Sequence, residues 1–481
     1  MGKVLSIVAL ALFATAAPAV AQDVYVLVVT GDQPPAVQGR GAAGLYVPGQ
    51  GLRASREEAL ERLGPLPQQA CGAIGQCEFE LFVSVPPLGS RRNDKRYEIT
   101  ILGDGYRGIL VSDQTRIPGL VSIADIRDTV DALEEGRDPP LEWRESKHPI
   151  DELRELDEQL SDARDAQGPA TVALTLALIA LVALALLTRS ALLARAALLY
   201  PLVAIGLALG ASALHQVGPL VTPAVVLAAV PLALLAAARV PLTLAVPVFL
   251  AGYGLVLALS PETNALMAIG PHPWSGGRFY GVTNEIETLL LGPALATGFA
   301  LRGWRLVALA LLSLVVVGAS DTGADGGGIL VFATGFAVLG LLLHGRSRAI
   351  PLAVLGAAVV GLAFVGLDAL VGGSSHVTDA VSGGPRELFD TFRQRAERSV
   401  SIATSTVWQL ATLVAGVAIL GTFARLKPRF PVVDAFLVAI AVSLVVNDSP
   451  TKVAGYGAIV CGALRAWSVS RQRPLGIESP T

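Results

Sequence analysis

Long apolar runs recur along most of this chain and restrict what it can fold into. From residue 170 onward each run is about 17–22 residues long, and short polar or basic segments separate successive runs. A helix of about 20 apolar residues crosses a hydrocarbon layer about 30 Å thick. We therefore expect an α-helical polytopic membrane protein with about 10–11 transmembrane helices, at residues 170–187, 194–212, 219–237, 241–259, 282–300, 304–320, 327–344, 350–371, 403–424, 431–447 and 451–468.

The charged residues divide the chain into an acidic part and a basic part. Residues 22–168 carry 16 basic and 26 acidic side chains, whereas residues 169–481 carry 19 basic and 13 acidic ones. Because no basic patch with interleaved aromatic residues occurs, nucleic acid is not an expected partner. The composition predicts the lipid bilayer as the main surroundings of the second part.

The N-terminus has the features of an export signal. Lys3 precedes an apolar stretch at residues 4–17, and residues 19–21 (Ala-Val-Ala) form a small-x-small cleavage site. The alternative, a first transmembrane helix, fits less well because the apolar stretch is short. We predict a signal peptide at residues 1–21 and export of the segment that follows.

Residues 22–149 are expected to form a small extracytoplasmic α/β domain. Four short segments rich in β-branched residues predict strands, at residues 23–30, 78–85, 96–103 and 108–113. Helical stretches follow some of them, at residues 55–63 and 123–133. Residues 150–168 carry leucines at helical spacing among many charges, which predicts an amphipathic stalk.

The positions of Lys and Arg predict the orientation of the membrane domain, residues 169–470. With the α/β domain outside, every short cytoplasmic loop is basic, as the positive-inside rule requires. The tail at residues 471–481 is then cytoplasmic. The predicted location is the inner membrane of a bacterial cell, with several passes.

Polar residues inside the apolar runs are costly in a bilayer and indicate a candidate site. In the predicted topology they lie at the extracytoplasmic ends of helices, together with a loop at residues 386–398. The candidate substrate-binding residues are Arg278, Tyr280, Asn284, Glu285, Glu287, Asp321, Asp325, Asn447 and Asp448.

Helix capping is one interpretation of these groups. Thr283, Asp325 and Ser449 are residue types that suit N-caps, and Pro450 suits the first helical position. Carboxylates near a helix N-terminus also gain about 0.3–1 kcal/mol from the helix dipole.

A polar pocket open to the outside is the second interpretation. Arg278 is suited to a phosphate or carboxylate, and the glycines at residues 326–328 could expose backbone N–H groups to an anionic head group. Glu285 and Asp325 would then act as proton acceptors or cation ligands. The catalytic residues of such a site are not predicted.

The remaining cysteine and histidine residues give weaker signals. Cys71 and Cys77 are predicted to be exported, where they form either a local disulfide or two free thiols. Cys461 lies in an apolar run and is expected to be a packing residue. His215 and His272 lie in short loops and are expected to be solvated. We expect no metal ion and no cofactor, because no ligand cluster is visible.

Two parts of the sequence resemble known proteins. Residues 115–126 (TRIPGLVSIADI) are similar to the late segment of alkaline-phosphatase-like domains. Residues 277–285 (GRFYGVTNE), the run 321–328 (DTGADGGG) and residues 447–449 (NDS) resemble an uncharacterised family of bacterial polytopic membrane proteins. Members of that family join an extracytoplasmic alkaline-phosphatase-like domain to a helical membrane domain.

The resemblance implies a degenerate domain rather than a phosphatase. Such enzymes hold two metals with several Asp and His ligands, yet no histidine occurs between Gln22 and Leu141. A domain without these ligands could still bind a ligand or a partner.

Three functional hypotheses remain open on the sequence. The first is an envelope protein that handles an anionic or lipid-linked precursor at an outward-facing polar site, by transport or by transfer. The second is a non-enzymatic scaffold or regulator of envelope assembly, which would bind an envelope-protein partner. The third is a proton- or cation-coupled transporter of a small solute.

Overall fold

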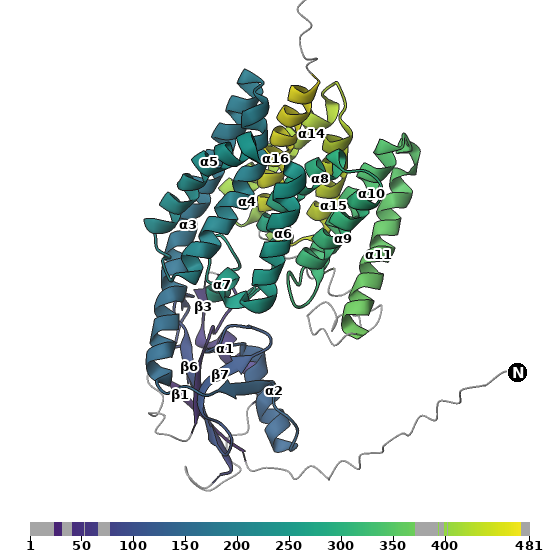
Figure 1. Cartoon of the computed structure of the whole chain (residues 1–481). Coiled ribbons are helices and arrows are strands. Elements are labelled where there is room, and N and C mark those ends of the chain that lie inside the picture. The colour runs from purple at the N-terminus through teal and green to yellow at the C-terminus, as the bar shows by residue number, and fades with distance from the viewer. Residues whose placement is uncertain are drawn as a thin grey trace, which may run out of the picture. The chain divides into compact units, whose positions relative to one another are not determined.

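The computed structural model describes residues 24–30, 41–51, 53–65, 77–370, 393, 399–401 and 403–472. Within the chain, contacts define two compact units: Met1–Asp113 with Pro118–Leu153, and Gln114–Ile117 with Arg154–Thr481. We call them the α/β unit and the helical unit (Figure 1). The predicted signal peptide lies outside the described residues.

The α/β unit is built on a mixed sheet. Its strands lie in the order β1-β4-β6-β2-β7-β9, and β8 also pairs with β2. The strand bounds are β1 Val24–Thr30, β2 Ala42–Tyr46, β4 Phe79–Val85, β6 Tyr97–Gly103, β7 Gly108–Ser112, β8 Leu120–Val121 and β9 Leu141–Arg144; β3 (Arg53–Ala54) and β5 (Arg91–Arg92) form a separate pair. The four predicted strands are confirmed as β1, β4, β6 and β7.

Two helices complete the α/β unit, and both begin at a serine cap. Helix α1 (Arg56–Leu63) starts after Ser55, whose hydroxyl accepts a hydrogen bond from the Glu58 amide. Helix α2 (Ile123–Glu134) starts after Ser122 in the same way. Their apolar sides join the strands in one core, so the predicted small α/β domain is confirmed.

The helical unit is a bundle of long apolar helices. Their bounds are α3 Pro149–Thr188, α4 Ala191–Ala213, α5 Val221–Arg239, α6 Leu242–Leu259, α8 Asn284–Ala300, α9 Trp304–Gly318, α10 Gly326–Leu343, α11 Ile350–Leu370, α14 Val407–Arg425, α15 Pro431–Val446 and α16 Pro450–Arg471. Shorter pieces are α7 (Pro261–Ala265), η1 (Pro273–Ser275) and η2 (Ser347–Ala349). Each predicted span overlaps one of the long helices.

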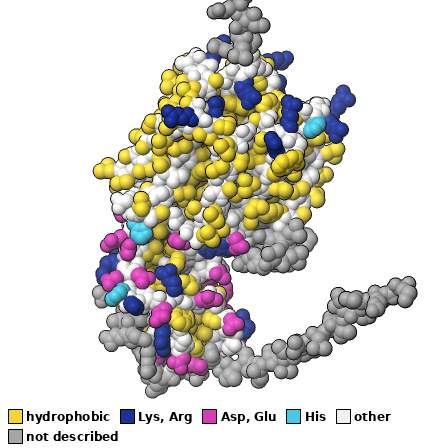
Figure 2. Space-filling model, in the orientation of Figure 1, with side chains coloured by type: hydrophobic (Ala, Val, Ile, Leu, Met, Phe, Trp, Pro, Cys, Tyr) yellow, Lys and Arg dark blue, Asp and Glu magenta, His cyan; other side chains and the backbone are white. Residues whose placement is uncertain are grey.

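Six of the described helices are long and apolar enough to cross a membrane: α3, α4, α5, α6, α10 and α14. Figure 2 shows hydrophobic side chains over a broad band of this unit, with Lys and Arg gathered at the upper end. Helix α3 contains both the predicted stalk and the first predicted span in 40 residues without interruption. The chain therefore joins a small N-terminal α/β unit to a bundle whose six long apolar helices are compatible with membrane spans.

Candidate functional site

Polar side chains from well-separated segments meet where α8, α10 and α16 begin and α15 ends. Asn284 Nδ2 donates to Asp448 Oδ1 at 2.9 Å, and Asn447 Nδ2 donates to Glu287 Oε2 at 2.7 Å. Both contacts join the start of α8 to the link between α15 and α16. We call the set Arg278, Asn284, Glu287, Asp325, Ser443, Asn447 and Asp448 the polar centre.

Glu287 is the most deeply buried acid of the polar centre, with 0% of its surface exposed. Its Oε2 accepts from Asn447, whose amide also lies 2.8 Å from the Ser443 hydroxyl on α15. Its Oε1 is buried and has no hydrogen-bond partner among the described residues. A buried polar atom without a partner costs about 1–3 kcal/mol, so the burial of this oxygen needs a physical reason.

Asp325 stands at the N-cap position of α10 but does not cap the helix with its side chain. Its carboxylate lies 3.9 Å from the Arg278 guanidinium, and Arg278 also donates to the Ala324 carbonyl at 3.3 Å. The expectation that capping explains Asp325 is therefore wrong. The loop before α8 and the loop before α10 are joined by a cation–carboxylate contact instead.

The other two predicted caps differ from each other. Thr283 caps α8, because its hydroxyl accepts from the Ile286 amide. Ser449 makes no such bond to α16, and its hydroxyl donates to Asp448 Oδ1 at 3.2 Å. Pro450 is the first residue of α16, as predicted. Capping thus accounts for Thr283 and not for the acidic residues.

The glycines of the predicted motifs serve close packing. Gly281 has φ +85°, and a Cβ there would lie 2.1 Å from the Gly323 carbonyl, which accepts from the Val282 amide at 2.8 Å. A Cβ at Gly327 would lie 2.1 Å from Asn447 Oδ1. The glycines therefore let neighbouring backbone and the Asn447 amide approach, and the proposed role of residues 326–328 in binding an anion has no support in this geometry.

The loop before α8 is anchored by Asn264, which the sequence reasoning did not select. Asn264 is fully buried, accepts from the Tyr253 hydroxyl at 2.9 Å, and donates to the Gly281 carbonyl at 2.8 Å. These bonds hold the chain just before Thr283. The start of α8, and with it Glu285 and Glu287, is positioned from α6 as a result.

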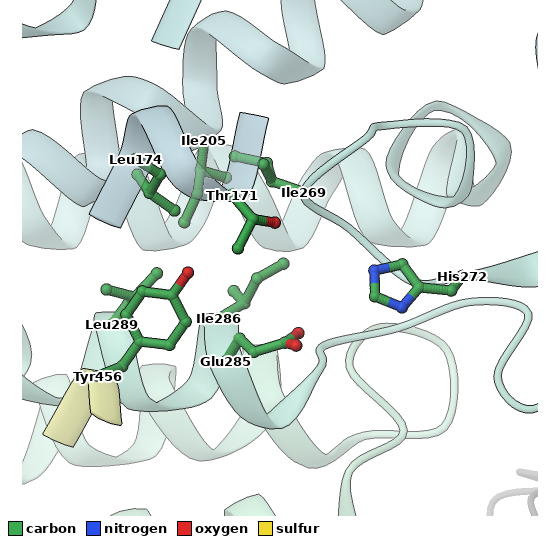
Figure 3. Close-up of a pocket in the computed structure, with 9 residues that line it drawn as sticks. All are labelled: Thr171, Leu174, Ile205, Ile269, His272, Glu285, Ile286, Leu289 and Tyr456. Atoms are coloured by element: carbon green, nitrogen blue, oxygen red, sulfur yellow. The ribbon is translucent and has the colours of Figure 1, made fainter. Parts of the chain in front are cut away.

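Glu285 lies outside the polar centre and forms an ion pair with Lys452 of α16. Its carboxyl also lines a small pocket, which we call the side pocket, with a cavity volume of about 20 Å³. That volume suits about one water molecule. The lining residues are Thr171, Leu174, Ile205, Ile269, His272, Glu285, Ile286, Leu289 and Tyr456 (Figure 3).

His272 borders the side pocket and is not solvated, so that expectation is wrong. Figure 3 shows its ring at one end of the pocket, on the side toward which the Glu285 carboxyl extends. Gln167 of α3 lies 2.8 Å from its Nε2. Burial first, and then the charge of Lys452, lower the pKa of His272 to about 3, so the ring is neutral at ordinary pH. His215 is exposed, as predicted, and contacts Glu155 and Gln159.

Besides Glu285, two predicted site residues are not brought into the polar centre. Asp321 has 87% of its side chain exposed, and Tyr280 is half-buried. Cys77 is disulfide-bonded, but Cys71 lies outside the described residues, so their pairing stays a prediction. The predicted loop at residues 386–398 also lies outside them, apart from residue 393.

Sequence reasoning missed several residues that complete these sites, for identifiable reasons. Ser443 stands one turn before Asn447 in an apolar run, which was a usable signal. Lys452 was not selected, because a single lysine beside an apolar run is an ordinary feature of a loop. Thr171 and Tyr456 lie on helices far apart in sequence, and no pattern in either helix points to the other. Among the described residues, no three His, Cys, Asp or Glu side chains gather as metal ligands.

No protein-family model, curated protein or solved structure matches the chain. The two resemblances described above therefore stay predictions.

Proposed function

We propose that the chain is a multi-pass protein of a bacterial inner membrane that handles an anionic or lipid-linked envelope precursor at its polar centre. The observation that carries the proposal is the convergence of the polar centre. Asn284, Asp325 and Asn447, from three separate segments, contact partners on other segments. A scaffold whose polar groups served only as helix caps would not need these cross-contacts.

The proposed ligand is anionic because the partly exposed partners of Asp325 and Glu285 are cations. Arg278 and Lys452 keep 32% and 45% of their side chains exposed while contacting Asp325 and Glu285. A guanidinium has five N–H donors, and Arg278 uses few of them in these contacts. Both cations can thus meet a phosphate or carboxylate that arrives from the same end of the bundle.

The proposed orientation places the α/β unit and the polar centre outside the cytoplasm. Basic residues at the ends of α3, α5, α8, α10 and α14 support it: Arg189, Arg239, Arg302, Arg346 and Arg425. The export signal predicted at residues 1–21 supports it independently.

The orientation is tested by cysteine labelling of two exposed positions. Asp321→Cys should react with a membrane-impermeant maleimide in intact cells with a permeable outer layer, whereas Arg302→Cys should react only after the membrane is opened. Background should be low because Cys461 is buried and Cys77 is disulfide-bonded. The reverse pattern would overturn the orientation.

The ligand class is tested with a lipid phosphate as the probe. Native mass spectrometry of the full chain in detergent should show retention of undecaprenyl phosphate at least about tenfold above undecaprenol, because only the phosphate pairs with the cations. Arg278→Gln and Lys452→Gln should each reduce this preference severalfold, and Arg302→Gln, at an exposed site, should not. Equal retention of the two lipids by the unaltered chain would refute an anionic lipid ligand and favour a scaffold.

A further inference from the structure

We propose that Glu287 is an exchangeable proton-binding site inside the helical bundle. The inference goes beyond the proposed ligand and does not depend on its identity. It depends on two observations about one side chain, its complete burial and the state of its two oxygens.

The two oxygens of Glu287 are held differently, in a way that suits the carboxylic acid. Oε2 accepts from Asn447 Nδ2 at 2.7 Å, as a carbonyl oxygen would. Oε1 neither accepts from nor donates to any described group. A neutral O–H left without a partner costs less than an ionised oxygen left without one, so the acid form suits this oxygen better. An ionised carboxylate in the same place would keep one oxygen without any hydrogen bond.

The energies favour a proton over a permanently charged group. Burying a carboxylate costs several kcal/mol even after relaxation, and one hydrogen bond to a charged group returns about 1.5–3 kcal/mol. The first turn of α8 contributes about 0.3–1 kcal/mol through the helix dipole. The hydrogen bond and the helix dipole together do not offset the whole cost of burying the carboxylate. Glu287 can therefore bind a proton while the bundle stays folded.

Opposing charges near Glu287 make both protonation states reachable. Asp325 and Arg278, which contact each other, are charged members of the polar centre. The first favours the bound proton and the second favours the carboxylate. Because Arg278 is in contact with Asp325 and is partly exposed, a change in its position would alter the balance and release or take up the proton.

The other helices packed on α8 carry further charged groups among the described residues. Arg195 of α4 donates to the Val240 carbonyl, Arg465 of α16 donates to the Lys427 carbonyl, and Arg305 of α9 lies over the Trp304 ring. On α16, Lys452 is paired with Glu285. On α15, Asp434 is paired with Arg429 at 2.9 Å.

Their uncharged titratable groups are engaged as well. Tyr253 of α6 donates to Asn264, and Tyr200 of α4 donates to the Val226 carbonyl. His344 follows the last residue of α10 and lies 2.7 Å from the Gly340 carbonyl.

A metal cation is a poorer occupant of this place. Hard cations take six or more oxygen ligands, and no group of three acidic or other metal-binding side chains occurs among the described residues. A proton needs only the one oxygen that Oε1 provides. Buried acids that exchange protons are a recognised element of proton relays across membranes, which gives the site a direct use in coupled movement of a solute.

The proposal is tested by infrared spectroscopy on the full chain in vesicles of phosphatidylethanolamine and phosphatidylglycerol. The carbonyl stretch of a protonated carboxyl should appear near pH 5 and be lost as the pH rises to about 9. The Glu287→Gln chain should lack this pH-dependent band. Glu285→Gln, two residues away on the same helix, is the matched control and should retain it.

A second variant keeps the test independent of whether Glu287→Gln folds. Asn447→Ala removes the donor that stabilises the carboxylate, so loss of the Glu287 band should move about one pH unit or more higher. In the unaltered chain, a hydrophobic carbodiimide should modify Glu287 more at about pH 6 than at about pH 9.

A band that is absent, or that stays constant from about pH 5 to about pH 9, would overturn the proposal. So would an unchanged pH dependence in Asn447→Ala. None of these outcomes bears on retention of undecaprenyl phosphate, so failure of this inference and failure of the proposed function can be told apart.

Discussion

The α/β unit and the helical unit each bury an acidic side chain, and they hold it differently. Asp125 of α2 is 1% exposed, and its Oδ2 accepts a hydrogen bond from the Ser112 hydroxyl on β7. Glu287 of α8 is as deeply buried but keeps Oε1 without a partner. Asp125 joins a helix to a strand and forms no ion pair with a described cation, which is the pattern of a structural group. Glu287 stands among an amide, an acid and an arginine, which is the pattern of a group that changes state.

The pKa of Asp125 shows what burial does in the simpler case. Burial raises it, the hydrogen bond from Ser112 lowers it, and the charges of Asp128 and Asp113 raise it further, to about 6. A single hydroxyl donor thus fails to compensate for burial in the small core of the α/β unit. The comparison teaches that deep burial alone does not identify a functional acid. The charged groups and hydrogen-bond partners around the carboxyl distinguish a functional acid from a structural one.

The largest expected effect follows from removing the Asn447 amide, which donates to Glu287. Asn447→Leu should lower the free energy of unfolding by about 4 kcal/mol at about pH 8, because it leaves a buried carboxylate without its amide donor. The loss should shrink at about pH 5, where the acid form is populated. Denaturant titration in detergent micelles measures both values. Ser443→Ala, which keeps the hydrogen bond from Asn447 to Glu287, should cost about 1 kcal/mol, and equal costs would contradict this view of the centre.

Acidification should stabilise the α/β unit through Asp125. Its pKa rises from 3.8 in the unfolded chain to about 6 in the folded one. Stability is therefore highest below about pH 4 and falls as the pH rises through about 6, by at most about 3 kcal/mol. Hydrogen exchange of α2 peptides in the full chain should show this trend, and Asp125→Asn should remove it. A trend that persists in the variant would assign the effect to another group.

A methyl group at the start of α10 should disturb the polar centre. Gly327→Ala places a Cβ 2.1 Å from Asn447 Oδ1, which should cost about 2 kcal/mol and shift the proton affinity of Glu287. Gly340→Ala on the same helix meets no atom within 4 Å and should leave stability unchanged or raise it by up to about 1 kcal/mol. Denaturant titration compares the two, and a similar result for both would show that the approach of Asn447 is unimportant.

The smallest effects concern the helix caps of the two units. Thr283→Ala and Ser122→Ala should each cost about 1 kcal/mol, because each removes a hydroxyl that accepts from the first turn of a helix. Ser449→Ala should cost less than about 0.5 kcal/mol, since Ser449 makes no capping bond. Local hydrogen exchange at the three helix starts would show the difference, and a Ser449 effect as large as that of Thr283 would revive the capping interpretation.

The fold was largely predictable because its signals are local. Apolar runs of membrane length leave few alternatives, and each predicted span overlaps a helix. Strand β2 was missed because its sequence, AAGLY, contains no β-branched residue. It lies at the centre of the sheet because Gly44 allows Leu110 and Val121 to pack against it, with Leu110 Cβ 3.1 Å from where a Cβ would stand. That is a long-range effect, and no local pattern reports it.

The candidate site was predicted by residue type but not by partner. Glu285 and Glu287 are two residues apart, so they lie about 200° apart around α8. One therefore meets Lys452 at the side pocket and the other meets Asn447 in the polar centre. Which face belongs to which site depends on how α15 and α16 pack, and the α8 sequence contains no information about that. Asp325 was misjudged for the same reason, because its partner Arg278 comes from another loop.

The approach of Asn447 to Gly327 also limits how chains of this kind can diverge. With asparagine at position 447, position 327 has room only for the hydrogen of a glycine. Any larger residue there requires a shorter one at 447, and a shorter one no longer reaches Glu287. A lineage that loses one member of this trio should therefore soon replace the other two, and substitutions at the three sites should be inherited together.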